Sequence, residues 1–310
     1  MTASAVSSRL GKTCVVINEK AGAALGHDGD LLRDYVQDQL GAAATSLRVA
    51  SVRPSAIVEE LRRAVSDDAD TIIVAGGDGS VCAAANAAMG GRAVIGVIPL
   101  GTANLMARDL GMPLDFRAAI DALIDAEPVA IDVAEVNGRV FLCSSLLGLP
   151  SSLPRARQRL RGGSLLTRIR GYAAMARSIL RRTKSFKVRI DDGSGSRPVR
   201  MQLAVISNNP YDDSQLVSLV RPSLSTGKLG LYVMKHETFL GAAWLLLKAF
   251  LGSRPRDPQL ERREVETVTI EAITRKHFEL SNDGELERFA SPLVFRIRPA
   301  AIRMLRPRRA

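Results

Sequence analysis

Apolar runs of strand length alternate with helix-like segments along the first third of the chain, and this alternation constrains the fold more than any other feature. Strands are expected at 13–18, 46–52, 71–75 and 93–100. Helices are expected at 31–40, 55–65, 80–89 and 102–110, with Thr102 as the N-cap of the last one. Because most of these strands are apolar along nearly their whole length, they predict a parallel sheet that helices cover on both faces, an α/β fold.

The second half of the chain has a different pattern. Short strand-like segments follow one another after residue 130, and Asn137-Gly138 between two of them is typical of a hairpin turn. Two helical segments, near 164–182 and 238–252, interrupt this series. A chain of 310 residues is longer than one core usually grows, so we expect a second domain of mostly antiparallel β structure.

Positive charge is concentrated in one segment. The formal net charge is +11, and twelve Lys or Arg residues lie between Arg155 and Arg189 without one acidic residue among them. Such a block favours a polyanionic partner, either nucleic acid or an anionic membrane surface, although a solvated helix face would carry the same charges. Aromatic residues for stacking on bases are nearly absent from the block, which argues against nucleic acid.

The termini and the cysteines bear on the compartment. The N-terminus lacks the charged start and apolar core of a secretory signal, and the apolar run at 239–247 is about half as long as a bilayer span. Cys14, Cys82 and Cys143 lie far apart among apolar neighbours, which predicts buried free thiols in a reducing cytoplasm. The three histidines are equally scattered, so we expect neither a zinc site nor a histidine base.

A glycine-rich loop follows the strand at 71–75, in the sequence TIIVAGGDGSVCAAANAAM. A strand that ends in glycines and turns at once into a helix leaves backbone N–H groups free at the helix start, where the helix dipole also favours negative charge. These features predict a phosphate site, although a plain strand-to-helix turn has the same glycines. Asp78 is itself an anion, so we expect it to act through Mg²⁺ or to fix the loop.

A second loop of the same kind occurs one strand later, in VIPLGTANLMARDLGMP at 97–113. Two loops at the carboxyl ends of parallel strands face the same crevice, so Gly101, Thr102 and Asn104 are expected opposite the first loop. Neither loop fits a familiar nucleotide motif: Cys82 stands where the dinucleotide pattern needs its third glycine, and GKT at 11–13 precedes its strand.

Near the C-terminus, SNDGELE at 281–287 places Asp283 and Glu285 on either side of Gly284. If the segment is extended, both carboxylates point the same way and could bind Mg²⁺ or act as a base for a hydroxyl. Asp-Gly is also common in hairpin turns, and this second interpretation stays open.

The order GGDGS, PLGTAN and NDGEL resembles the diacylglycerol kinase and sphingosine kinase catalytic-domain family, especially its bacterial lipid kinases. The resemblance extends from NEKAG at 18–22 to the final SPLVFRIRPAAIRML. It implies an N-terminal α/β domain, similar to that of NAD kinases, and a C-terminal β-sandwich-like domain, with ATP and Mg²⁺ in the cleft between them. It also implies that the chain returns to the first domain near residue 291, which gives domains at 1–132 with 291–310 and at 133–290.

The resemblance implies roles for particular residues. Glu285 would be the general base that takes the proton from a lipid hydroxyl, with Asp283 beside it. Asp78 is the third candidate catalytic residue, and Asp78 and Asp283 are the candidate metal ligands. The nucleotide would contact Asn18, Glu19, Lys20, Ala21, Gly22, Ser51, Gly76, Gly77, Asp78, Gly79, Ser80, Gly101, Thr102 and Asn104.

The chain departs from the family pattern at several positions. Glu19 stands in place of proline, Ser80 in place of threonine, and Ala83 where the family has an acidic residue. Thr226 replaces an aspartate that would bind a structural Mg²⁺, so we do not expect that second metal.

The sequence therefore predicts an ATP-dependent lipid kinase acting on a lipid such as diacylglycerol, cytoplasmic and bound peripherally to the anionic inner face of the membrane. A homodimer is left open. One alternative is a soluble kinase of the NAD kinase type, which would not explain PLGTAN or NDGEL. Another is a non-catalytic nucleotide or lipid binder, which Ala83 and Thr226 favour.

Overall fold

A computed structural model describes residues 10–24, 29–148, 185–212, 221–235, 260–274 and 276–308. The chain divides into two compact units. The N-terminal unit comprises Met1–Ile131 and Ala300–Ala310, and the C-terminal unit comprises Asp132–Pro299. The expected mixed α/β fold, with a parallel sheet first and antiparallel structure after it, is confirmed.

The N-terminal unit is a parallel sheet in the strand order β2-β1-β3-β4, with the end of β16 beside β4. Its strands are β1 (Lys12–Asn18), β2 (Ser46–Val52), β3 (Thr71–Gly76) and β4 (Val94–Pro99). Its helices are α1 (Glu19–Ala24), α2 (Gly29–Gly41), the short 3-10 helix η1 (Pro54–Ala56), α3 (Ile57–Ser66), α4 (Asp78–Ala88), α5 (Leu105–Asp109) and α6 (Phe116–Ile124). Every residue of β3 is buried, as expected of a strand with helices on both faces.

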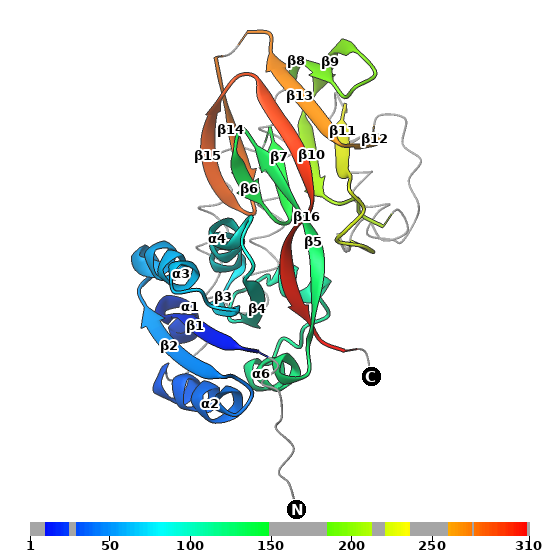
Figure 1. Cartoon of the computed structure of the whole chain (residues 1–310). Coiled ribbons are helices and arrows are strands. Elements are labelled where there is room, and N and C mark those ends of the chain that lie inside the picture. Colours follow the sequence, from blue (N-terminus) through cyan, green and yellow to red (C-terminus); the bar gives the residue numbers. More distant parts are fainter. Residues whose placement is uncertain are drawn as a thin grey trace, which may run out of the picture. The chain divides into compact units, whose positions relative to one another are not determined.

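The direction of each crossover decides which face a helix covers. The chain steps one way along the sheet from β1 to β2 and the other way from β2 to β3 and from β3 to β4. Right-handed crossovers therefore place α2 on one face and α3 and α4 on the other. Helices α3 and α4 contact each other, as do α2 and α6 (Figure 1).

Three boundaries in this unit differ from the expected ones. Residues 19–24 form α1, which is not among the expected helices; Lys20 and the alanines are good helix formers, and Glu19 suits a first turn. Helix α4 begins at Asp78, so the glycine loop includes the helix N-terminus. Helix α5 begins only at Leu105, and its N-cap is Asn104 instead of Thr102.

The C-terminal unit contains two antiparallel sheets. One joins β16, β13, β8 and β9 and also includes β5 and β6, and the other has the order β12-β11-β10-β7-β14-β15. The strands are β5 (Glu127–Val136), β6 (Arg139–Phe141), β7 (Ser144–Leu147), β8 (Phe186–Asp191), β9 (Ser196–Met201), β10 (Leu203–Asn208), β11 (Leu229–Met234), β12 (Leu260–Val265), β13 (Thr267–Ala272), β14 (His277–Asn282), β15 (Glu285–Ala290) and β16 (Leu293–Arg306).

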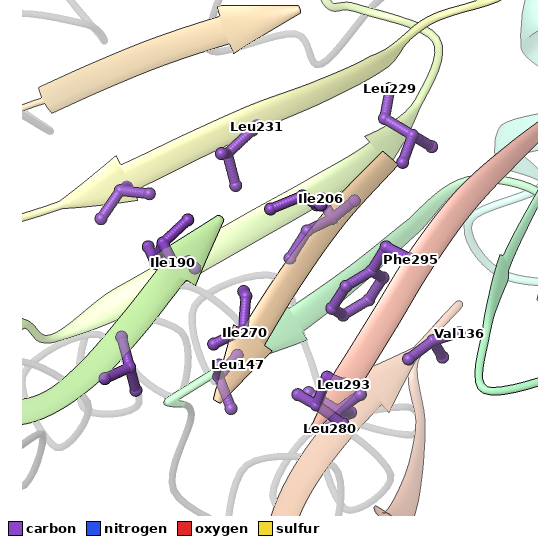
Figure 2. Close-up of a cluster of buried hydrophobic side chains, with 14 of the residues drawn as sticks. Val136, Leu147, Ile190, Ile206, Leu229, Leu231, Ile270, Leu280, Leu293 and Phe295 are labelled. Atoms are coloured by element: carbon purple, nitrogen blue, oxygen red, sulfur yellow. The ribbon is translucent and has the colours of Figure 1, made fainter. Parts of the chain in front are cut away.

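The core of the C-terminal unit lies between its two sheets. Leu147, Ile206 and Leu280 from one sheet belong to the same buried cluster as Ile270 and Phe295 from the other (Figure 2). The Asn137-Gly138 hairpin turn is present as expected, with both residues at positive φ.

A network of charges also joins the two sheets. Asp192 and Arg197, at the β8–β9 turn, contact Glu261 and Arg263 of β12, and Lys235 contacts Glu261 at 2.7 Å. Although burial opposes ionisation, hydrogen bonds from Arg197 and Lys235 lower the pKa of Glu261 to about 2.

Strand β16 contributes to both units. Its first residues pair with β13, whereas Arg303 and Met304 pair with β4. The second boundary therefore lies within the strand, at Pro299 and Ala300, and the sequence expectation placed it at the start of the strand.

Several expectations fall on other parts of the chain. The helices predicted near 164–182 and 238–252, and most of the arginine block, lie outside the described residues. Cys14 and Cys143 are buried and outside any disulfide, as expected, whereas Cys82 is only half-buried.

Candidate functional site

One group of candidate site residues lies at one edge of the N-terminal sheet. Strands β1, β3 and β4 run parallel, and Ile17 pairs with Ala75 while Gly76 pairs with Pro99. The carboxyl ends of the three strands therefore meet at the same edge, and both predicted loops begin there.

The two glycine loops contact each other through their backbones. A Cβ added to Gly77 would lie 3.2 Å from the Gly101 Cα, and one added to Gly101 would lie 2.6 Å from the Gly77 Cα. Glycine at 101 is required for this approach, and a side chain at 77 would be tighter than ordinary contact. The prediction that the loops face each other therefore agrees with the geometry of the N-terminal unit.

Asn18, at the end of β1, reaches the glycine loop. Its Nδ2 donates to the Ser80 Oγ at 3.1 Å, and Gly76 leaves room for the Ser80 side chain, since a Cβ on Gly76 would lie 2.6 Å from that oxygen. The Oδ1 of Asn18 is buried and has no hydrogen-bond partner among the described residues. A buried acceptor of this kind needs a donor to offset its desolvation.

Asp78 is the first residue of α4 and is half-buried. Its Oδ1 accepts a long hydrogen bond, 3.4 Å, from the N–H of Met106 in α5. The carboxylate thus links the starts of α4 and α5. The first N–H groups of α4, those of Asp78 and Gly79, have no intrahelical partner and provide donors at the positive end of the helix dipole.

Asn104 holds the second loop in shape. It has a left-handed backbone conformation, with φ of 49°, and is 9% exposed. Its side chain accepts from the Gly101 N–H at 2.8 Å and donates to the Gly101 carbonyl at 2.9 Å. Thr102 does not cap the helix and is exposed at the tip of the loop.

The remaining predicted nucleotide contacts surround this edge. Ser51 is exposed near the end of β2 and pairs with Ile17 of β1. Glu19 and Lys20 are exposed in the first turn of α1, where Ala21 and Gly22 follow them. The structure therefore brings Asn18, Ser80 and the two glycine loops into contact, and it places Ser51 and α1 at the same end of the sheet.

The β14–β15 hairpin of the C-terminal unit holds a separate group of candidate residues. Asp283 and Gly284 have positive φ values of 46° and 90°, and Asn282 pairs directly with Glu285. This is the two-residue turn that Asp-Gly favours. The segment is therefore not extended at Asp283, and the expectation that both carboxylates point the same way is wrong. Asp283 belongs to the turn, whereas Glu285 is exposed on β15.

The Asp283 carboxylate is bound by backbone donors. It accepts from the N–H groups of Leu142 at 2.7 Å, Cys143 at 2.8 Å and Ser144 at 2.9 Å. Burial raises the pKa of the Asp283 carboxyl, and these three donors, with the positive charge of Arg221, act in the opposite direction. Asp283 thereby fixes the turn that presents Glu285.

The sequence did not reveal the polar residues beneath this turn. Arg221, Asn208 and Asp132 are all nearly fully buried, and Thr226 donates to Asn209 through both its N–H and its hydroxyl. None of them lies in a motif that the sequence distinguishes. Thr226, which occupies the position of the expected aspartate, thus takes part in a hydrogen-bond network.

The chain is similar to proteins of known family. Residues 12–136 match the model of the diacylglycerol kinase catalytic domain family. The N-terminal part of the chain therefore resembles a diacylglycerol kinase catalytic domain. The diacylglycerol kinase of Staphylococcus epidermidis is 26% identical over 233 residues, which cover 73% of this chain and 71% of the relative. That of Staphylococcus carnosus is 40% identical over 85 residues, which cover 27% of this chain and 28% of the relative.

Solved structures show the same fold. A diacylglycerol kinase from Bacillus anthracis superposes with a TM-score of 0.71 at 20% identity, over 95% of this chain and 96% of that one. A second structure from the same organism has a TM-score of 0.76 at 22% identity, over 95% and 97%. The two-unit architecture is therefore that of diacylglycerol kinases of known structure.

Within the described ranges, no group of three or more His, Cys, Asp or Glu side chains could hold a metal ion. In the same part of the chain, no helix is long and apolar enough to cross a membrane.

Proposed function

We propose that this protein is an ATP-dependent lipid kinase, which transfers the γ-phosphate of ATP to a hydroxyl of a lipid such as diacylglycerol. The contact between the glycine loops at Gly77 and Gly101, at the carboxyl edge of a parallel sheet, is the observation that supports it most strongly. Similarity to the diacylglycerol kinase catalytic domain and to diacylglycerol kinases supports the lipid acceptor.

The residues at this edge fit a nucleotide. The backbone donors at the start of α4 would bind phosphate oxygens, and the close approach of Gly77 and Gly101 holds the second loop beside these donors. The buried, unpartnered Oδ1 of Asn18 would accept a hydrogen bond from the nucleotide or from bound water. ATP supplies the phosphoryl group, and the loops orient it.

The residues also fit Mg²⁺ held partly by the nucleotide. Mg²⁺ is often bound by one or two carboxylates together with phosphate oxygens and waters, so a cluster of three acids is not required. Asp78, at the mouth of the loops, would be the protein ligand in the N-terminal unit. Both acceptor positions of the Asp283 Oδ1 are used by backbone N–H groups, so only its Oδ2 could take part.

Glu285 would act as the general base that takes the proton from the acceptor hydroxyl. It is exposed beside a turn that Asp283 holds rigidly, and an exposed carboxylate on a fixed backbone can accept a proton from a bound hydroxyl. Asp283 would position it and would not react itself.

The arginine block supports the further proposal that the enzyme binds an anionic membrane surface from the cytoplasmic side. Each Lys or Arg near such a surface contributes on the order of 1 kcal/mol. Lys187 and Arg189, the described end of the block, are exposed on β8. Co-sedimentation with vesicles should rise with anionic lipid content and fall with salt; binding that ignores both would reject this part of the proposal.

Transfer of radiolabelled γ-phosphate tests the main proposal. The acceptors are diacylglycerol, sphingoid bases, phosphatidylglycerol and a total lipid extract, with NAD as the soluble competitor. We expect a labelled lipid and no labelled NADP. Labelling of NAD alone would support a kinase of the NAD kinase type, and ATP binding without any transfer would support the non-catalytic binder that Ala83 suggests.

A further inference from the structure

Arg221 is a buried charge for which the proposed reaction gives no direct use. It is 4% exposed, and arginine is almost never so deeply buried unless its guanidinium is paired. Its Nη1 donates to the carbonyl of Leu142 at 2.5 Å and to that of Asn208 at 2.8 Å, and its Nη2 lies 3.8 Å from the Sγ of Cys143. The guanidinium is therefore directed at the segment that holds Asp283.

A second buried side chain acts on the same carbonyl. The Nδ2 of Asn208, which is 1% exposed, donates to the Leu142 carbonyl at 3.0 Å and to the Asp132 carbonyl at 2.9 Å. The Leu142 carbonyl thus receives two donors, one of them charged. Hydrogen bonds from a charged donor are the stronger ones, so Arg221 contributes most to fixing its direction.

The Leu142 carbonyl and the Cys143 N–H belong to one peptide unit. Such a unit is planar and trans, so its C=O and N–H point in opposite directions, and fixing one fixes the other. Arg221 binds the carbonyl at one edge of this peptide unit. At the opposite edge, the Cys143 N–H donates to the Asp283 Oδ1 at 2.8 Å.

We propose that Arg221 is a positioning residue for the turn at Asp283 and Gly284, the acidic turn. It orients the Leu142–Cys143 peptide, whose N–H holds Asp283, and thereby sets the position of Glu285. The inference rests on the proposed function, in which Glu285 is the base. The turn transmits the position directly, because Asn282 and Glu285 are paired across it and the Asp283 N–H also donates to the Ser144 carbonyl at 2.9 Å.

Hydrogen exchange tests the physical link without any activity. The variants are Arg221→Met and Arg221→Lys, and the matched control is Arg296→Met, an exposed arginine on β16. In both Arg221 variants, amides within residues 141–146 should exchange at least about 10-fold faster, because a lysine cannot reproduce the planar fork of arginine. The control should match the wild type. Unchanged exchange in this segment, or faster exchange spread evenly over the whole protein, would overturn the proposal.

Kinetics tests the consequence for the reaction. Displacing a reacting group by about 1 Å costs on the order of 100-fold, so Arg221→Lys should lower kcat by roughly 10- to 100-fold. The KM for ATP should stay within about twofold of the wild type, because the ATP loops belong to the N-terminal unit. If Arg221→Met does not fold, Arg221→Lys, which keeps the buried charge, provides both measurements.

A double variant separates positioning from general loss of stability. If Arg221 acts through Asp283, then Arg221→Lys combined with Asp283→Asn should have the kcat of Asp283→Asn alone. If the losses in kcat of the two single variants instead multiply in the double variant, the proposal is overturned. If the wild type phosphorylates no lipid, the proposed function fails, and the exchange experiment still decides whether Arg221 orients the segment.

Discussion

The close approach of the two glycine loops makes Gly101→Ala the most direct test of the nucleotide site. The new Cβ would lie 2.6 Å from the Gly77 Cα, about 0.8 Å short of ordinary contact at 3.4 Å, so the loops must move apart by nearly that amount. A displacement close to 1 Å at a reacting group costs on the order of 100-fold, which corresponds to about 2.7 kcal/mol. Crowding of this kind also lowers the free energy of unfolding by about 1–3 kcal/mol.

The assay measures ATP affinity by calorimetry and lipid phosphorylation by transfer of label, with thermal unfolding alongside. Gly41→Ala is the matched control, because nothing lies within 4 Å of a Cβ at that position. We expect Gly101→Ala to reduce kcat/KM for ATP about 100-fold and Gly41→Ala to leave it unchanged. If Gly101→Ala binds ATP as tightly as the control, the loop contact does not form the nucleotide site.

Three further predictions concern charged and thiol groups. Glu285→Gln should lower kcat by at least about 100-fold with little change in Tm, since Glu285 is exposed; normal kinetics would show that it is not the base. The pKa of Glu261 is lowered to about 2 from 4.5, so the ionised carboxylate stabilises the folded state above pH 4.5, and this contribution is lost as the pH falls toward 2. Glu261→Gln should therefore cost about 1 kcal/mol in urea unfolding at pH 7, and the difference should vanish near pH 2. Burial raises the pKa of Cys14 to about 11, so iodoacetamide at pH 8 should alkylate the half-buried Cys82 first, as mass spectrometry of digests would show.

Much of the N-terminal unit could be predicted because its signals are local. The run TIIVA and the glycines after it determine a buried strand and a tight turn within ten residues, and β3 and α4 follow that pattern. The start of α5 could not be predicted in this way. Thr102 has the intrinsic preference for an N-cap, but the two hydrogen bonds between Asn104 and Gly101 shape the loop differently.

The environment of the acidic turn was not predictable for a different reason. Asp283 is held by residues about 140 positions earlier in the chain, and no periodic pattern links such distant segments. Arg221 is one of 43 Lys and Arg residues, and its burial follows only from the packing of β10 and the segments around it. Asp-Gly did indicate a hairpin, and that local interpretation is confirmed.

Strand β16 has a consequence for the order in which the chain can fold during synthesis. In the parallel sheet of the N-terminal unit, β4 has β3 on one side and the last residues of β16 on the other, with Met304 fully buried. Until residue 304 leaves the ribosome, β4 remains an open edge with unpaired backbone groups. The N-terminal unit is thus translated first but completed only when the end of β16 is available. A fragment ending at residue 136, where the family match ends, would lack the last strand of this unit.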